Sequence, residues 1–226
     1  MIDNGFEPEF SDAVFRQLEE IKRSNTTDGD MGAKDLRDLL WSSIDNRTSR
    51  DLDQVEWVEQ LENGDIRVLV GIADVDRLVT QGSPIDEHAR KNTVTVYTEN
   101  KIFPMLPEEL STDITSLNEG EDRVAMVADM TVKADGDVPV STFYSAIVRN
   151  QAKLNYESIG EWLDGGQVPE KVANIEGLQA QIELQFEAAK RLAVYRRSKG
   201  ALLRLYRRGG RSLVITVRSV ARRQRG

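Results

Sequence analysis

The chain has no cysteine and a single histidine, His88. The absence of cysteine excludes disulfide bridges, disulfide-linked partners and thiolate metal sites. A single histidine leaves little scope for metal sites or catalytic triads that depend on histidine. No apolar run approaches the roughly 20 residues of a membrane-spanning helix. The N-terminal stretch lacks a basic segment followed by an apolar core, so we expect no secretory signal, no membrane partner and a cytoplasmic location. Any chemistry would have to use carboxylates, hydroxyls and a bound metal.

Charge is unevenly distributed along the 226 residues. The formal net charge is −8, yet residues 200–226 contain eight arginines and no acidic residue. The remainder of the chain carries 38 acidic and 22 basic side chains. An acidic bulk argues against broad nonspecific binding of nucleic acid, although a local basic groove would remain compatible with it.

Three aspartates fall close together in residues 44–54: Asp45, Asp51 and Asp53. Positioned carboxylates are the usual ligands of a hard cation such as Mg²⁺. Acidic loops are also typical of solvated turns, so the cluster has two interpretations when taken alone. Residues 55–61 then alternate apolar and polar, Asn63-Gly64 predicts a two-residue hairpin turn, and residues 66–75 continue the alternation. We therefore expect the acidic segment to be a loop on a rigid sheet.

The other patterns predict an α+β fold: a mixed, largely antiparallel twisted sheet with flanking helices. A helix capped by Ser11 or Asp12 should bury Ala13, Phe15, Leu18 and Ile21, and a linker should follow at residues 24–32. Strands are expected at 93–97, 124–132 and 138–148, with a turn at 133–137, and helices at 85–90, from Pro107, at 156–163 and at 171–198.

The motifs occur in an order that resembles the catalytic domain of the RNB family, the exoribonucleases of the ribonuclease II and ribonuclease R type. The resemblance runs from about residue 35 to residue 201. It rests on Ser43-Ile44-Asp45, Arg50-Asp51-Leu52-Asp53, Gly71-Ile72-Ala73-Asp74-Val75, Gly82-Ser83 to Asp86, the strand ending in Tyr97, Phe103-Pro104-Met105-Leu106-Pro107-Glu108-Glu109-Leu110-Ser111, Ser116-Leu117, Arg123 and Lys153-Leu154-Asn155-Tyr156.

The resemblance implies Mg²⁺-dependent 3′-to-5′ hydrolysis of single-stranded RNA to nucleoside monophosphates. Asp45, Asp51 and Asp53 fall on the family's metal-binding carboxylates and are our candidate catalytic residues. Asp45 and Asp51 are expected as metal ligands, and Asp53 as a ligand or a water-orienting group. Gln54, where the family usually has a fourth aspartate, completes the candidate metal set, because its amide can still give one oxygen.

Two tyrosines are candidates for binding RNA. Tyr97 falls where the family places an aromatic ring that stacks on bases near the RNA 3′ end, and Tyr156 matches another family tyrosine near the terminal nucleotide. Stacking suits an enzyme that tolerates any sequence, because every base has a π-face. The alternatives are that Tyr97 is a residue at the edge of the core and that Tyr156 packs at the start of a helix.

The sequence departs from the family pattern elsewhere. Gly71 stands where the family often has a histidine. We expect the family's cold-shock-type domains to be missing, because the stretch before Asp35 is too short to hold them. After residue 202 the family's long second half is replaced by arginine-rich sequence, which predicts a frameshifted or truncated reading frame. Alternatively, the tail is a basic segment that binds RNA, in which Val214, Ile215 and Val217 could form a strand.

These observations predict three parts: an N-terminal helix and linker at 1–34, the N-terminal part of an RNB catalytic domain at 35–202, and a basic tail at 203–226. The leading function is exoribonuclease. The alternatives are a truncated, catalytically inactive RNA-binding or regulatory fragment and an acidic protein–protein module. The oligomeric state stays open.

Overall fold

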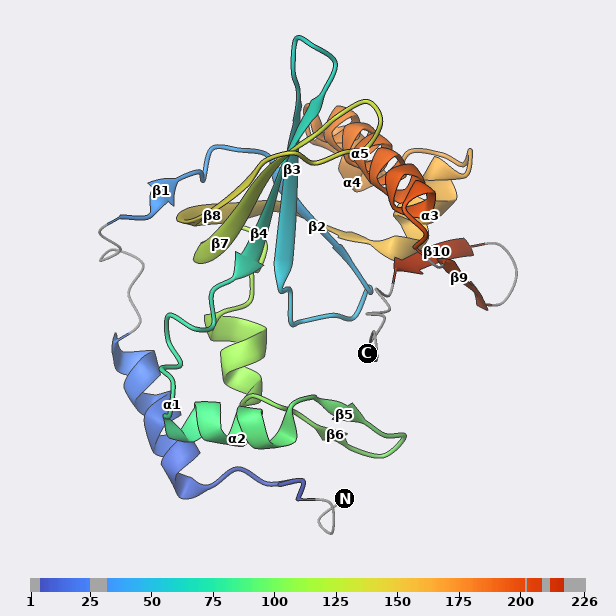
Figure 1. The fold of residues 1–226 in the computed structure, drawn as a ribbon. Helices are drawn as coiled ribbons and strands as arrows, with labels where there is room; N and C mark the ends of the chain where they lie inside the picture. Colours follow the sequence, from blue (N-terminus) through green and yellow to red (C-terminus); the bar gives the residue numbers. More distant parts are fainter. Residues whose placement is uncertain (1–4, 25–31, 202, 209–211, 218–226) are drawn as a thin grey trace, which may run out of the picture.

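A six-stranded mixed sheet forms the centre of the molecule (Figure 1). The computed structural model describes residues 5–24 and 32–201, and the backbone of residues 203–208 and 212–217. The strands lie in the order β1-β8-β2-β3-β4-β7, and β1 and β2 run parallel to β8 while the other pairs are antiparallel. The strands are β1 (Lys34–Asp35), β2 (Trp41–Asp45), β3 (Gln54–Gln60), β4 (Ile66–Ala73), β7 (Asp122–Val132) and β8 (Ser141–Asn155). The helices below complete the expected α+β fold.

The long strand β8 closes the sheet on itself. Its first part pairs with β7, from Ser141 opposite Met130 to Arg149 opposite Asp122, and its second part, from Asn150, pairs with β2. The short strand β1 pairs with residues 146 and 147, within the part that also pairs with β7. Alternating residues of the strands therefore point into a common interior. The buried residues there are Trp41, Leu52, Val55, Leu69, Leu117, Ala125, Val127, Ala146 and Val148. This interior is the base on which the acidic loop rests.

Three helices cover one side of the sheet (Figure 1). They are α3 (Tyr156–Leu163), α4 (Glu170–Asn174) and α5 (Leu178–Ser198). Helix α5 packs on the outer faces of β3, β4 and β7 around Val58, Val68 and Val132. The side-chain amide of Gln181 also bonds the backbone of Val58 in both directions, donating to its carbonyl at 2.7 Å and accepting from its N–H at 3.0 Å. A helix side chain thus takes the place of a strand partner at this point of β3.

At the other end of the sheet, α1 (Asp12–Ser24) packs against α2 (Pro84–Asn92) and the short π-helical segment η3 (Leu110–Ile114). Val14, Leu18 and Ile21 fill this contact. The expected helix is confirmed, but Phe15 is not on its buried face. Val14 takes that position because it lies four residues before Leu18, which in turn lies three residues before Ile21, the spacing of one helix face. Next to this unit is the hairpin β5 (Val96–Tyr97) and β6 (Ile102–Phe103).

Glycine and a left-handed threonine explain several boundaries that differ from the expectations. The β3–β4 turn is longer than two residues, because the N–H of Gly64, with φ +81°, bonds the carbonyl of Leu61. The expected helix 171–198 is broken at Gly177 (φ +79°), where α5 begins. The strand expected at 93–97 shortens to β5 because Thr93, at φ +63°, caps the end of α2.

Long-range contacts explain the remaining differences. The strand expected at 138–148 begins only at Ser141 and runs on to Asn155, because its second part gains β2 as a partner. On α5, Phe186 is exposed and Gln185 is buried, since the Gln185 amide donates to Oγ of Ser42 at 3.3 Å.

Of the linker expected at residues 24–32, residues 25–31 lie outside the described part of the chain, and Ser24 is the last residue of α1. In the tail, the backbone forms an antiparallel hairpin of β9 (Leu203–Arg208) and β10 (Ser212–Val217), which confirms the strand expected around Val214. The structure describes only the backbone of the tail and not its arginine side chains. The frameshift and the RNA-binding explanations of the tail therefore stay predictions, and so does the division of the chain into three parts.

Candidate metal and nucleic-acid site

The acidic segment joins two neighbouring strands at one end of the sheet. Asp45 is the last residue of β2 and Gln54 is the first of β3, so the loop itself comprises residues 46–53. The expectation of a loop throughout residues 44–54 was therefore wrong at both ends. Strand backbone positions Asp45 and Gln54 more rigidly than a loop would.

Long-range hydrogen bonds fix the second half of the loop. Leu52 is only 2% exposed and belongs to the interior of the sheet. Its N–H donates to Oγ of Ser116 at 3.0 Å, and its carbonyl accepts from the N–H of Leu117 at 2.8 Å. The Ser116 hydroxyl donates in turn to the carbonyl of Arg50 at 3.0 Å, and the Ala73 N–H donates to the Asp53 carbonyl at 2.9 Å. Asp51 and Asp53 flank the buried leucine, so their exposed side chains are held on the side of the loop away from the core.

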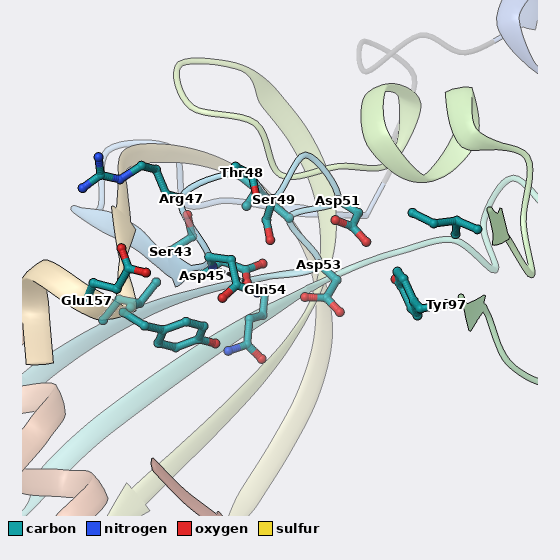
Figure 2. A pocket seen from close by; sticks show the side chains of 15 residues that line it. Ser43, Asp45, Arg47, Thr48, Ser49, Asp51, Asp53, Gln54, Tyr97 and Glu157 are labelled. Atoms are coloured by element: carbon teal, nitrogen blue, oxygen red, sulfur yellow. Dashed lines mark hydrogen bonds between the residues drawn. The ribbon is translucent and has the colours of Figure 1, made fainter. Parts of the chain in front are cut away.

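A cleft of about 1090 Å³ opens beside this loop. Figure 2 shows the side chains of Asp45, Asp51, Asp53 and Gln54 together, with Tyr97 beyond Asp53. Tyr97 comes from β5 and Tyr156 from the start of α3, so segments far apart in sequence meet here. The six residues singled out from the sequence all line this cleft: Asp45, Asp51, Asp53, Gln54, Tyr97 and Tyr156. Their roles remain predictions.

The charges of Asp45 and Asp51 act on the carboxyl group of Asp53. The pKa of Asp53 is raised, first by partial burial of its carboxyl group and then by the negative charges of Asp45 and Asp51. The pKa of Tyr156 is also raised, by burial and by the charges of Asp45, Asp53 and Glu56. Negative charge therefore accumulates on this side of the cleft, an arrangement that a bound cation would relieve.

Glu56 is an acidic residue near the site that the motif comparison did not identify. It lies two residues after Gln54 on β3, so alternation places both side chains on the same face of the strand. Burial raises the pKa of its carboxyl group. The alternation of residues 54–58 was the signal that could have found it.

The donor chemistry fits Mg²⁺, which prefers oxygen ligands and retains several waters. Asp45, Asp51 and Asp53 would provide carboxylate oxygens and Gln54 an amide oxygen. Within the part of the chain that the structure describes, no three acidic or histidine side chains are gathered closely enough to hold a metal by themselves. The fit therefore rests on the oxygen donors and on the effect of the Asp45 and Asp51 charges on Asp53.

Gly71 occupies a position where a side chain would meet the interior of the sheet. A Cβ atom there would lie 3.0 Å from Cγ2 of Val55 and 3.5 Å from Cβ of Ala125. The first distance is tighter than ordinary contact. The histidine that the family pattern suggested here would have to displace Val55, so the packing of this core explains the glycine.

Comparison with known proteins agrees with the geometry. Residues 33–207 match the RNB domain. Ribonuclease R of Thermotoga maritima is 34% identical over 195 residues, covering 86% of this chain and 27% of that protein. Ribonuclease R of Escherichia coli is 37% identical over 155 residues, covering 69% of this chain and 19% of that protein. The structure of Mycoplasma genitalium RNase R in complex with double-stranded RNA superposes with a TM-score of 0.80 at 26% identity, over 89% of this chain and 35% of that one.

The fold and the family match thus define the chain as part of an RNB domain. The chain belongs to the RNB family, that of ribonuclease R and ribonuclease II, as its motifs predicted. It spans between about a fifth and a quarter of the length of the two relatives named above. Among the described helices, none has the length and apolar character needed to cross a membrane.

Proposed function

We propose that this chain supplies the metal-binding and RNA-binding side of an exoribonuclease that hydrolyses single-stranded RNA from its 3′ end to nucleoside monophosphates, with Mg²⁺. One observation carries the proposal: three aspartates share a cleft with two tyrosines from distant parts of the sequence. The similarity to ribonuclease R over most of the chain supports the same function.

The aspartates bind the metal and orient the reacting groups. Asp45 and Asp51, at the end of β2 and beside the buried Leu52, would hold Mg²⁺ with Gln54. When bound, Mg²⁺ supplies positive charge to a scissile phosphate and lowers the pKa of a bound water. Asp53 lies between the two strands and is held through its backbone by Ala73, which suits it to accept a hydrogen bond from the attacking water or to bind metal.

The tyrosines position the RNA. Tyr97 is 69% exposed and Tyr156 is also largely exposed, so each has ring surface available to a base. Stacking a base on an aromatic ring contributes roughly 1–3 kcal/mol and does not depend strongly on which base it is. The two rings therefore suit an enzyme that removes nucleotides one after another regardless of sequence.

A degradation assay tests the proposal. The purified chain is incubated with a 3′-overhang RNA and Mg²⁺, with EDTA as a control, and both product release and a mobility shift are measured. We expect Mg²⁺-dependent release of nucleoside monophosphates. A shift without degradation would indicate the inactive RNA-binding alternative, and neither signal would favour an acidic protein–protein module.

Asp53→Asn gives the sharpest version of this assay. It should abolish hydrolysis and leave RNA binding intact, because it removes a charge and keeps the shape of the side chain. Asp164→Asn is the matched control, since Asp164 is exposed at the end of α3 and does not line the cleft. Unchanged turnover in Asp53→Asn would contradict the role assigned to Asp53.

The second candidate function is RNA binding without hydrolysis. Gln54 favours it, because an amide in place of a carboxylate lowers the negative charge available to a cation. The tyrosines would keep their RNA-binding role in that case.

A further inference from the structure

The hairpin β5–β6 presents two side chains to the cleft. Tyr97 pairs with Ile102 and Val96 pairs with Phe103. Residues directly opposite each other in an antiparallel pair lie on the same face, so Tyr97 and Ile102 share one face and Val96 and Phe103 the other. Tyr97 and Ile102 both line the cleft beside the aspartates. Ile102 is 53% exposed, which is high for an isoleucine that borders a cleft.

The opposite face of the hairpin is held by the N-terminal segment. The ring of Phe6 meets the ring of Phe103 edge to face, with centroids 6.0 Å apart. Nζ of Lys101 lies 2.8 Å from a carboxylate oxygen of Glu9. The turn is closed by the N–H of Thr98, which donates to the carbonyl of Lys101 at 3.1 Å. Because one face is anchored in this way, the other face is presented to the cleft in a defined orientation.

We propose that Ile102 binds nucleobases, forming with Tyr97 a two-residue platform for the RNA strand that enters the acidic cleft. The inference rests on the proposed function and extends it to a residue that the motifs did not identify. A base that stacks on Tyr97 would also cover the neighbouring aliphatic side chain, which removes apolar surface from water. An aliphatic contact to the flat face of a base does not discriminate between bases, in keeping with a sequence-tolerant enzyme.

The test compares Ile102→Ser with a matched variant. Binding is measured by fluorescence anisotropy with a labelled single-stranded oligoadenylate of about 12 nucleotides, in EDTA so that no hydrolysis occurs. We expect the dissociation constant to rise roughly three- to tenfold in Ile102→Ser. Val94→Ser is the control, because Val94 is 55% exposed in the same part of the chain but does not line the cleft. Its dissociation constant should equal that of the wild type.

A second RNA separates base contact from a structural role in the hairpin. With abasic sites at the 3′-terminal nucleotides, the wild type and Ile102→Ser should bind equally, because the base that Ile102 contacts is gone. An Ile102→Ser penalty of the same size on abasic and intact RNA would overturn the inference. A second variant, Ile102→Trp, enlarges the platform and should bind intact RNA at least as tightly as the wild type, and weaker binding would also count against it.

The outcomes distinguish this inference from the proposed function. If the wild type binds RNA and Ile102→Ser binds it equally well, the inference is wrong and the proposed function is unaffected. If the wild type binds no RNA at all, the proposed function fails, and the inference fails with it.

Discussion

The N–H of Leu52 donates a hydrogen bond to Oγ of Ser116, 3.0 Å away and 64 residues further along the chain. The same hydroxyl bonds the carbonyl of Arg50 at 3.0 Å, and the N–H of Leu117 bonds the carbonyl of Leu52. The acidic loop is thus attached to a second segment on both sides of its buried leucine. These hydrogen bonds determine the positions of Asp51 and Asp53.

Ser116→Ala should therefore weaken both stability and the site. The substitution leaves the buried N–H of Leu52 without its partner, which costs about 1–3 kcal/mol. We expect the free energy of unfolding in urea to fall by about that amount, and turnover of RNA to fall as well. Ser141→Ala, at the exposed start of β8, is the control and should change neither quantity. A Ser116→Ala protein with wild-type stability would show that the bond is dispensable.

Gln54→Asp should strengthen metal binding. A fourth carboxylate adds negative charge where the charges of Asp45 and Asp51 already raise the pKa of Asp53. We expect Mg²⁺ to bind roughly tenfold more tightly, measured by isothermal titration calorimetry. Gln60→Asp places the same change at the exposed far end of β3 and should have no such effect. Equal Mg²⁺ affinity in Gln54→Asp and the wild type would argue against Gln54 lying in the metal site.

Gly71→Ala should destabilise the protein although it adds only one carbon. The new Cβ would lie 3.0 Å from Cγ2 of Val55 inside the closed sheet. Overpacking of this kind costs about 1–3 kcal/mol, which a urea titration detects. Gly160→Ala is the contrast, because a Cβ at Gly160 on α3 meets nothing within 4 Å and alanine favours a helix by up to about 1 kcal/mol. The two substitutions should shift stability in opposite directions, and a stabilised Gly71→Ala would contradict the packing argument.

His88 should make the protein less stable as the pH falls. Its side chain is buried on α2, where its Nε2 lies 3.0 Å from Nδ2 of Asn92 and its ring contacts Phe10. Burial lowers the pKa of His88 below its ordinary value of 6.5, and the charge of Glu7 opposes that shift only in part. Below pH 6.5 the unfolded chain takes up the proton more readily than the folded one, so the stability present above pH 6.5 is lost on acidification.

Urea unfolding between pH 7 and pH 5.5 measures this effect, with His88→Gln as the variant that lacks the titrating group. The wild type should lose more stability over this range than the variant does. Because His88 is the chain's single histidine, its ring resonances also report its pKa directly by NMR. A pKa at or above 6.5 would contradict the prediction.

Much of the local structure followed from the sequence. The reversal of the chain at Asn63-Gly64 (though not its length), the helix that begins after Asn155 and the helix after Ser11 all depend on capping or turn residues within a few positions. The order of the motifs was sufficient for the family, because each motif is itself local. The aspartates and tyrosines could be named for the same reason.

The tertiary structure decided which of these local pieces meet. The closure of the sheet by β8 depends on pairing between segments more than a hundred residues apart, such as Ser42 with Ala152, and no local period encodes that pairing. The same long-range contacts determine that Gln185 rather than Phe186 faces the sheet and that Gly71 has no space for a side chain. The pairing of Ile102 with Tyr97 is local to one hairpin, but the position of both residues at the cleft beside the aspartates is tertiary. The sequence by itself determined the residues available for chemistry and the elements that carry them. Their common cleft arose only from the folded chain, because hydrophobic burial and strand pairing act between residues that are neighbours in space and not in sequence.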